Sequence, residues 1–270
     1  MKKFFTIMLM LMLVATTKVS AEQEKADEYR KIFSSDTFYV EYDDKNVKQI
    51  LAEKNGQRMS RTTLGGRYAT IVSVLNPIAA MFQSGSTKYP EFLHSNGKYY
   101  KFAEKDYATM IEEDRLDDEN LNPKEGWSAI NKNLSLPDEL AVFNWKDKYH
   151  VVSKSISEPV YATSMKKVVN GITYDCDRYA STIKMASGRK EAMLVFDMLY
   201  QNGELVIAQS AIFANDKEYE VNKLIIKKIS NKVPDNEFKV YEKAKVYSAG
   251  QGDMNDLLEI PVFVGKFSDM

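Results

Sequence analysis

Hydrophobic and polar residues alternate along much of the chain, with the two-residue period of half-buried β-strands. In the segment Thr37–Tyr42, the side chains of Phe38, Val40 and Tyr42 fall on one face. The segment Lys239–Tyr247 alternates in the same way, and the side that collects its lysines and tyrosines is typical of a strand face turned to water. The alternation predicts a mainly β fold.

Four Asn-Gly pairs divide the alternating segments into hairpins. A type I′ turn needs positive φ at both central residues, and Asn followed by Gly meets this need with little strain. The pairs and the strands that they join are Asn55-Gly56 (Gln49–Lys54 and Arg58–Thr63), Asn96-Gly97 (Tyr89–His94 and Lys98–Phe102), Asn170-Gly171 (Val160–Val168 and Thr173–Lys184) and Asn202-Gly203 (Met193–Tyr200 and Glu204–Phe213). Further strands are expected at Leu224–Ile229 and Ile260–Phe267, so the pattern predicts a curved, meandering antiparallel sheet.

Three segments have a helical pattern instead. Gln23–Phe33 reads as a short polar helix, and Leu136–Trp145 begins with Pro137 followed by two acidic residues, as helices often do. The segment Arg67–Gln83 is apolar almost all round, and Pro77 is expected to kink it. A helix of this kind must be buried or must cover an apolar surface.

Residues 1–21 have the features of a secretory signal peptide. Lys2 and Lys3 precede an apolar run from Phe4 to Ala15, and small residues occupy the end of the segment at Ala21. The apolar run is shorter than the about 20 residues that a membrane span needs. The pattern therefore predicts cleavage near Ala21 and a periplasmic or secreted mature protein.

Composition limits what the mature chain can be. With 44% hydrophobic and 28% charged residues the chain is expected to be globular, and a formal net charge of −1 offers no electrostatic footprint for nucleic acid. No later apolar run approaches a membrane span, so no stable transmembrane segment is expected after cleavage. We expect residues 22–270 to form a single β-rich extracytoplasmic domain. The stretch 112–132 is expected to be an excursion or linker, and its acidic run 112–119 a solvated loop, since it lacks the ligand pattern of an EF-hand.

Motifs for catalysis or metal binding are not found in the sequence. The chain contains no His-Glu-x-x-His helix, Gly-x-Ser-x-Gly elbow or Walker loop. His94 and His150 are expected to be surface residues. Cys176 is the only cysteine, so it is expected to be a small buried residue, with an intermolecular disulfide or a reactive thiol as the alternatives. We therefore expect no enzymatic activity, no cofactor and no metal.

The apolar segment Arg67–Gln83 supplies the candidate ligand-binding residues. If it closes over the apolar face of a curved sheet as a lid, acyl chains would be stabilised there by about 0.8 kcal/mol per buried CH₂ group. The expected lid residues are Tyr68, Ile71, Val72, Leu75, Ile78, Met81 and Phe82.

The second half of the chain resembles a known family. The runs Val169–Tyr179, Leu199–Val206 and Val233–Phe238 have the cadence of the periplasmic lipoprotein-carrier (LolA/LolB-like) superfamily, over about residues 160–245. The resemblance implies an incomplete β-barrel with helices packed on its concave face and a non-catalytic role in handling lipid. It assigns no site residue, and the acidic run 112–119 departs from the family pattern.

These features leave three classes of function. The first is an exported binding protein that carries a lipid or the acyl chain of a lipoprotein in an apolar cavity. The alternative is a structural or interaction protein of the cell envelope, with a filled core and envelope proteins as partners. A hydrolase whose acidic residues are not evident from the sequence is the third.

Overall fold

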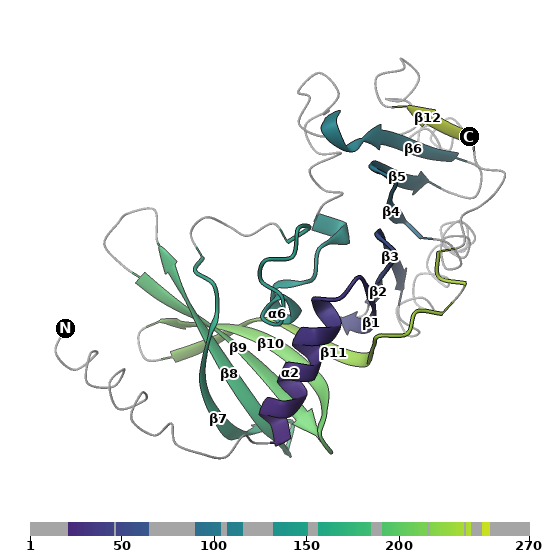
Figure 1. The fold of residues 1–270 in the computed structure, drawn as a ribbon. Helices are drawn as coiled ribbons and strands as arrows, with labels where there is room; N and C mark the ends of the chain where they lie inside the picture. The colour runs from purple at the N-terminus through teal and green to yellow at the C-terminus, as the bar shows by residue number, and fades with distance from the viewer. Residues whose placement is uncertain are drawn as a thin grey trace, which may run out of the picture. The chain divides into compact units, whose positions relative to one another are not determined.

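The fold is built mainly from β-strands (Figure 1). The computed structural model describes residues 21–45, 47–64, 90–103, 107–115, 132–150, 156–184, 191–214, 217–234, 236–238 and 245–248. Within these residues the helices are few and short, and almost all strand pairs are antiparallel. The expected mainly β, antiparallel fold is confirmed, whereas the packing of helices on a concave face stays a prediction.

The chain divides into two compact units. The first comprises Met1–Ser35 and Leu136–Lys227, and the second comprises Asp36–Ser135 and Lys228–Met270. Each unit therefore combines segments that are far apart in the sequence. The stretch 112–132 falls within the range of the second unit, and its residues 116–131 lie outside the described residues.

Five strands form the sheet of the first unit, in the order β11-β10-β9-β8-β7, with antiparallel neighbours. Their bounds are β7 Val160–Val169, β8 Ile172–Lys184, β9 Glu191–Gln201, β10 Glu204–Ala214 and β11 Lys217–Ser230. The register shifts once in each of three pairings, between Tyr161 and Thr163, between Leu205 and Ile207, and between Ser210 and Ala211. Bulges of this kind increase the local twist of a sheet, and the strands twist visibly in Figure 1.

Seven strands form the sheet of the second unit, in the order β12-β6-β5-β4-β3-β2-β1. Their bounds are β1 Thr37–Asp44, β2 Val47–Lys54, β3 Gln57–Leu64, β4 Phe92–Ser95, β5 Lys98–Ala103, β6 Tyr107–Glu112 and β12 Lys245–Ser248. Only β12 runs parallel to its neighbour, β6, among the pairs of this unit that the structure describes.

All four predicted Asn-Gly turns are present. The asparagines have φ between 51° and 53°, and the glycines that follow have φ between 69° and 79°. Positive φ at both central residues is the requirement of a type I′ turn. Each turn joins the pair of strands that the sequence pattern assigns to it.

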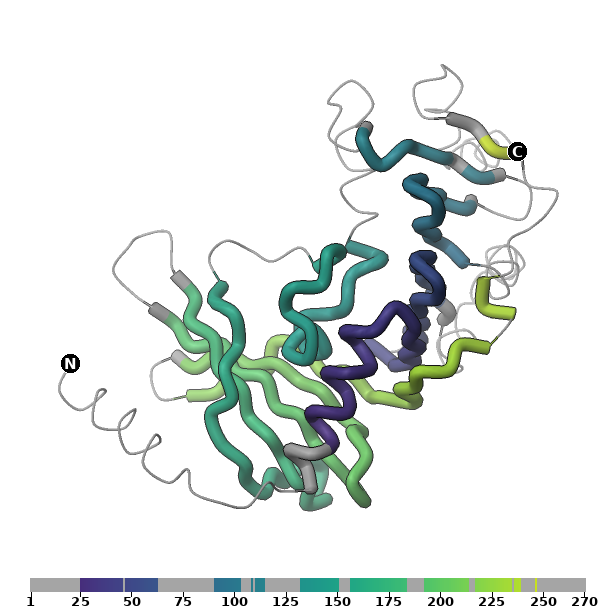
Figure 2. The backbone as a smooth tube through the Cα atoms, in the orientation of Figure 1, coloured from purple at the N-terminus to yellow at the C-terminus, as the bar shows by residue number. Residues whose placement is uncertain are grey.

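The helices agree with the sequence pattern only in part. Helix α2, Ala21–Phe33, matches the expected polar helix, but α6 is confined to Asp138–Ala141. Figure 2 shows the backbone turning back after α6. The prediction of a helix up to Trp145 is wrong because tertiary contacts override it: the side chain of Asn144 donates a hydrogen bond to the carbonyl of Phe33, at 2.8 Å. No helix within the described residues has the length and apolar character to cross a membrane.

Several strands have other limits than the sequence pattern suggests. Strand β11 begins at Lys217, well before the expected Leu224. Its first residues pair with β10 although all of the residues 217–221 are exposed, so this part lacks the alternation of a half-buried strand. Strand β6 was not expected as a separate strand. Of the segment Lys239–Tyr247, the structure describes only the part within β12, and Ile260–Phe267 lies outside the described residues.

Helix α2 and the segment after α6 cover one face of the first unit's sheet. The Tyr29 hydroxyl of α2 donates to Glu204 at 2.9 Å and accepts from the Leu205 amide at 3.1 Å. The ring of Phe143 stacks against that of Phe33, with 6.0 Å between centroids. Each such aromatic ring, once buried, stabilises the fold by about 1.5–3 kcal/mol. We call the covered face of this sheet the helix face and the opposite one the open face.

The core of the second unit is also filled by side chains of the chain itself. One cluster joins residues of neighbouring strands with residues of the segment after β11: Tyr39, Ile50, Ala52, Met59, Leu93, Tyr100, Phe102, Val233 and Phe238. On the other face of β3, the Arg58 side chain is 2% exposed and donates to Glu53 and to the carbonyl of Leu134. Its guanidinium lies 5.0 Å from the centroid of the Phe38 ring.

Candidate functional site

The expected lid residues cannot be placed. Tyr68, Ile71, Val72, Leu75, Ile78, Met81 and Phe82 all lie outside the described residues. The candidate site lies instead on the strands of the first unit, whose polar side chains the sequence pattern did not single out.

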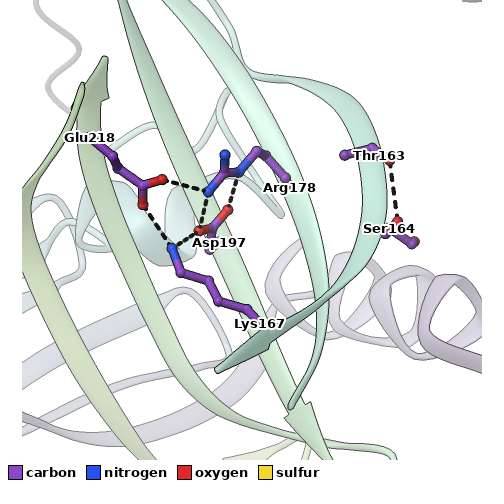
Figure 3. Close-up of polar contacts among 6 residues, drawn as sticks. All are labelled: Thr163, Ser164, Lys167, Arg178, Asp197 and Glu218. Atoms are coloured by element: carbon purple, nitrogen blue, oxygen red, sulfur yellow. Dashed lines mark hydrogen bonds and ion pairs between the residues drawn. The ribbon is translucent and has the colours of Figure 1, made fainter. Parts of the chain in front are cut away.

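Four charged side chains meet on the open face of the first unit's sheet. Lys167 of β7, Arg178 of β8, Asp197 of β9 and Glu218 of β11 point toward one another, as Figure 3 shows. Successive residues of a strand point to opposite faces. Arg178 therefore points away from Tyr179, whose hydroxyl accepts a hydrogen bond from Arg30 of α2 at 2.8 Å. We call these four residues the ion cluster.

Asp197 is the centre of the ion cluster. Its two carboxylate oxygens accept hydrogen bonds from Arg178 Nε at 2.6 Å and from Arg178 Nη2 at 2.7 Å. Lys167 Nζ lies 2.5 Å from Asp197 and 2.8 Å from Glu218, and Arg178 Nη2 lies 3.1 Å from Glu218. A planar guanidinium on a carboxylate in this two-point geometry is among the stronger polar contacts in proteins. The cluster contains two cations and two anions, so its formal charge is balanced.

Burial and hydrogen bonding act in opposite directions on Asp197. The Asp197 side chain is 1% exposed, and burial alone raises the pKa of a carboxyl group. The hydrogen bonds from Arg178 and Lys167 outweigh burial, so the pKa of Asp197 lies below its ordinary value. Both cations thus stay paired with an ionised carboxylate at neutral pH. The arrangement links β7, β8, β9 and β11 through charged side chains on one face of the sheet.

An apolar cluster lies beside the ion cluster on the same face. Tyr174, Cys176, Leu199 and Ile207 are buried there, and Met165, Val169, Val206 and Ile225 pack around them. Cys176 is 1% exposed and is not in a disulfide, as expected of a small buried residue. Burial raises the pKa of its thiol. A thiol of raised pKa is a poor nucleophile, which argues against the reactive alternative.

Strand β7 is the last strand of this sheet, and several of its large hydrophobic side chains are exposed. Eight large hydrophobic side chains are exposed among the described residues, and four of them lie on β7 or at the start of β8. These are Val160, Tyr161, Val168 and Ile172, and both valines are 65% exposed. Within the described residues no strand pairs with the outer edge of β7. An edge strand with such side chains is a place where another chain can add a strand.

Two lysines on β7 are held away from that outer edge. Lys166 Nζ is paired with Asp175 of β8, and Lys167 Nζ is held between Asp197 and Glu218 in the ion cluster. Lysine side chains on an edge strand normally hinder pairing with other strands. Here the acids of the inner strands draw both ammonium groups over the faces of the sheet, so this hindrance is reduced.

Buried polar atoms on both faces of the sheet mark places where water can bind. The Ser181 hydroxyl, the Tyr200 hydroxyl and Gln209 Oε1 are buried and have no hydrogen-bond partner among the described residues. Buried groups of this kind are usually satisfied by ordered water. Within the described residues, no three His, Cys, Asp or Glu side chains come together as a metal site.

The prediction that both histidines lie at the surface is wrong. His94 is 4% exposed, and its ring stacks on that of Tyr99 with 4.2 Å between centroids. The side chain of His150 is 1% exposed. Each imidazole has an acidic partner within the same unit, His94 with Glu113 at 3.3 Å and His150 with Asp138 at 3.0 Å.

The ion cluster was missed in the sequence, although one signal points to it. Asp197 interrupts an otherwise apolar run in the segment Met193–Tyr200. A single acidic residue in the middle of an apolar strand needs a buried cation as partner. Arg178, on the strand that precedes β9 in the chain, lies directly opposite Asp197 in the sheet, but no feature of its own segment marks it as the partner.

Comparison with known proteins adds no relative. Neither the family models, nor the curated proteins, nor the solved structures give a match. The likeness to the lipoprotein-carrier superfamily therefore stays a prediction.

Proposed function

We propose that the protein is exported and non-catalytic, and that it binds an extended segment of a partner protein along strand β7. The observation that carries the proposal is the outer edge of β7, which no described strand covers and which carries Val160, Tyr161 and Val168 in exposed positions. A partner strand would form main-chain hydrogen bonds with this edge, and its side chains would contact the exposed apolar ones.

The ion cluster supports this role by its place in the sheet. By holding Lys167 between Asp197 and Glu218, it keeps the ammonium group over the open face. It also joins β7 to β8, β9 and β11, which gives the edge strand a rigid backing. A preformed strand loses little conformational freedom when a partner binds, which favours affinity.

The filled cores favour an interaction protein over a carrier of lipid. On the helix face, Tyr29, Phe33 and Phe143 are at most 4% exposed. In the second unit, Val233 and Phe238 pack onto the cluster around Tyr39. The helix face of the first unit and the cluster around Tyr39 in the second unit are thus occupied by the protein's own side chains. The carrier hypothesis depends on the lid residues of the segment 67–83, which lie outside the described residues.

Export rests on the pattern of residues 1–21, with basic residues, an apolar run and a small residue at Ala21. The place of action that follows is the periplasm or the exterior of the cell, and envelope proteins are the expected partners.

The test is capture of the partner by matched variants of the full-length protein. Val160→Lys with Val168→Lys places two further charges on β7, whereas Val246→Lys changes a valine that is 53% exposed on β12 in the other unit. We expect a protein captured by the wild type and by Val246→Lys to be lost by at least about tenfold with the β7 double variant. Equal capture by all three proteins would rule out β7 as the binding edge. Native mass spectrometry of the same samples would show bound lipid if the carrier hypothesis is correct.

A further inference from the structure

His150 has a hydrogen-bond acceptor at each of its ring nitrogens. Nδ1 lies 3.1 Å from the carbonyl oxygen of Trp145, and Nε2 lies 3.0 Å from Asp138 Oδ1. A backbone carbonyl and an ionised carboxylate can only accept hydrogen bonds. A neutral imidazole has one N–H and can satisfy only one of them, whereas an imidazolium satisfies both.

The surroundings of His150 favour the charged ring. Its side chain is 1% exposed, and the ring meets that of Trp145 edge-on, with 4.5 Å between centroids. The acidic groups close enough to act on it are Asp138 of α6 and Asp147 of the following turn. The lysines on either side of Asp147 have other contacts, Lys146 with Glu158 at 3.7 Å and Lys148 over the ring of Tyr149 at 4.7 Å.

Trp145 connects this group to the sheet. Its ring contacts that of Phe196 on β9, with 6.3 Å between centroids. On α6, the residue after Asp138 is Glu139, whose carboxylate accepts a hydrogen bond from Ser210 of β10 at 2.6 Å. The segment 138–150 is therefore attached to the helix face at two places, and the imidazolium of His150 ties these two places together.

We propose that His150 is a proton-operated clamp: with both nitrogens protonated it ties α6 to the Trp145 carbonyl and holds the segment 138–150 on strands β9 and β10. Loss of one proton leaves either Asp138 or the Trp145 carbonyl without its donor. The segment then opens more often, so its attachment to the sheet weakens as the pH rises.

The direction of this pH dependence follows from the two titrating groups. Burial lowers the pKa of His150, but the hydrogen bonds to Asp138 and Trp145 raise it by more, so its pKa lies above the ordinary value. Burial raises the pKa of Glu139, and its hydrogen bond to Ser210 only partly opposes this. A group whose pKa is raised on folding contributes stability that is present below its unfolded pKa and is lost as the pH rises through its folded pKa. Both groups therefore act in the same direction.

Hydrogen exchange of the full-length protein tests the clamp. The amides of Leu140 and Ala141 both donate to the carbonyl of Pro137 at 2.8 Å, and the His150 amide donates to the carbonyl of Asp147 at 2.9 Å. After correction for base-catalysed exchange, we expect local opening at these amides to increase between about pH 6 and pH 9. The increase should be about tenfold for each unit by which the pKa of His150 differs between the closed and open segment.

A matched pair of variants separates the clamp from general effects of pH. The glutamine of His150→Gln cannot become charged, so this variant should lose most of the pH dependence of local opening. His94→Gln changes the other histidine, in the second unit, and should keep the pH dependence of the wild type. An equal pH dependence in His150→Gln and the wild type would overturn the proposal.

Nitrogen NMR of the His150 ring is a second test. It uses the wild-type protein, so it does not require that any variant folds. We expect both ring nitrogens of His150 to carry a proton at pH 6. A neutral ring with one protonated nitrogen at that pH would overturn the clamp.

Discussion

Asp197 of β9 and Arg178 of β8 form a two-point ion pair in the middle of a sheet, at 2.6 and 2.7 Å, with the carboxylate 1% exposed. The pair is completed by Lys167 and Glu218, so the charges of all four residues are compensated. It fixes the strands behind the edge strand β7 and directs Lys167 away from the outer edge.

Removal of the Asp197 charge should destabilise the protein strongly. Asp197→Asn leaves two partly buried cations with only Glu218 as an anionic partner, and breaking a buried ion pair from one side costs about 3–5 kcal/mol. Asp175→Asn is the matched control, since Asp175 also pairs with a lysine of β7 but its side chain is 40% exposed. We expect that change to cost less than about 1 kcal/mol. Equal free energies of unfolding in urea for the two variants would contradict the structural role of the ion cluster.

The ion cluster should also make the free energy of unfolding depend on pH in the acidic range. Burial raises the pKa of Asp197, but the hydrogen bonds from Arg178 and Lys167 lower it by a larger amount. The pKa of Asp197 is therefore lower in the folded protein than in the unfolded one. This contribution is present above the unfolded pKa, about 3.9, and is lost as the pH falls through the folded pKa. Urea unfolding from pH 6 downward should show a steeper loss of stability in the wild type than in Asp197→Asn. Parallel curves would exclude this assignment.

The hydroxyl of Tyr200 should contribute nothing to stability, because it is buried and has no hydrogen-bond partner among the described residues. Tyr200→Phe is expected to leave the free energy of unfolding unchanged or to raise it by about 1 kcal/mol. Tyr179→Phe, the comparison, removes the acceptor of a hydrogen bond from Arg30 and should lower it by about 0.5–1.5 kcal/mol. If Tyr200→Phe is the more destabilising of the two, an ordered water satisfies the Tyr200 hydroxyl.

The thiol of Cys176 should be unreactive in the folded protein. It is buried among Tyr174, Leu199 and Ile207, and burial raises its pKa. Iodoacetamide at pH 8 should modify it only after unfolding in urea, as followed by mass spectrometry. Modification of the native protein at the rate of the unfolded one would show that the open face opens readily at this position.

The sequence predicted the local features of the fold well, for a physical reason. The four Asn-Gly turns depend on the backbone preferences of two adjacent residues, which hardly change with context. The helix expected to extend to Trp145 ends at Ala141 instead, because Asn144 bonds to Phe33 and the Trp145 ring packs on Phe196, contacts with distant residues. Helical propensity over so short a segment is easily overridden by such contacts.

The candidate site was less accessible to sequence reasoning. The Asn-Gly turns predict two of the neighbouring strand pairs, but Lys167 and Glu218 meet Asp197 only through the register of all five strands from β7 to β11, which no local motif encodes. The predicted Asn96-Gly97 hairpin places His94 opposite Tyr99, but the burial of His94 also depends on the pairing of its strand with β3, where His94 lies opposite Arg58, and no local motif encodes that pairing. In the sequence, only the position of Asp197 in an otherwise apolar run indicates a buried ion pair.

Cross-linking from strand β7 tests the proposed function most directly. A photoreactive amino acid is placed at Val168 or, as the control, at Val246, which are 65% and 53% exposed, and the full-length protein is irradiated in the cells that produce it. The account predicts an adduct with another protein from position 168 and none above background from position 246. Irradiation that gives no protein adduct from position 168, or equal adducts from both positions, would contradict it.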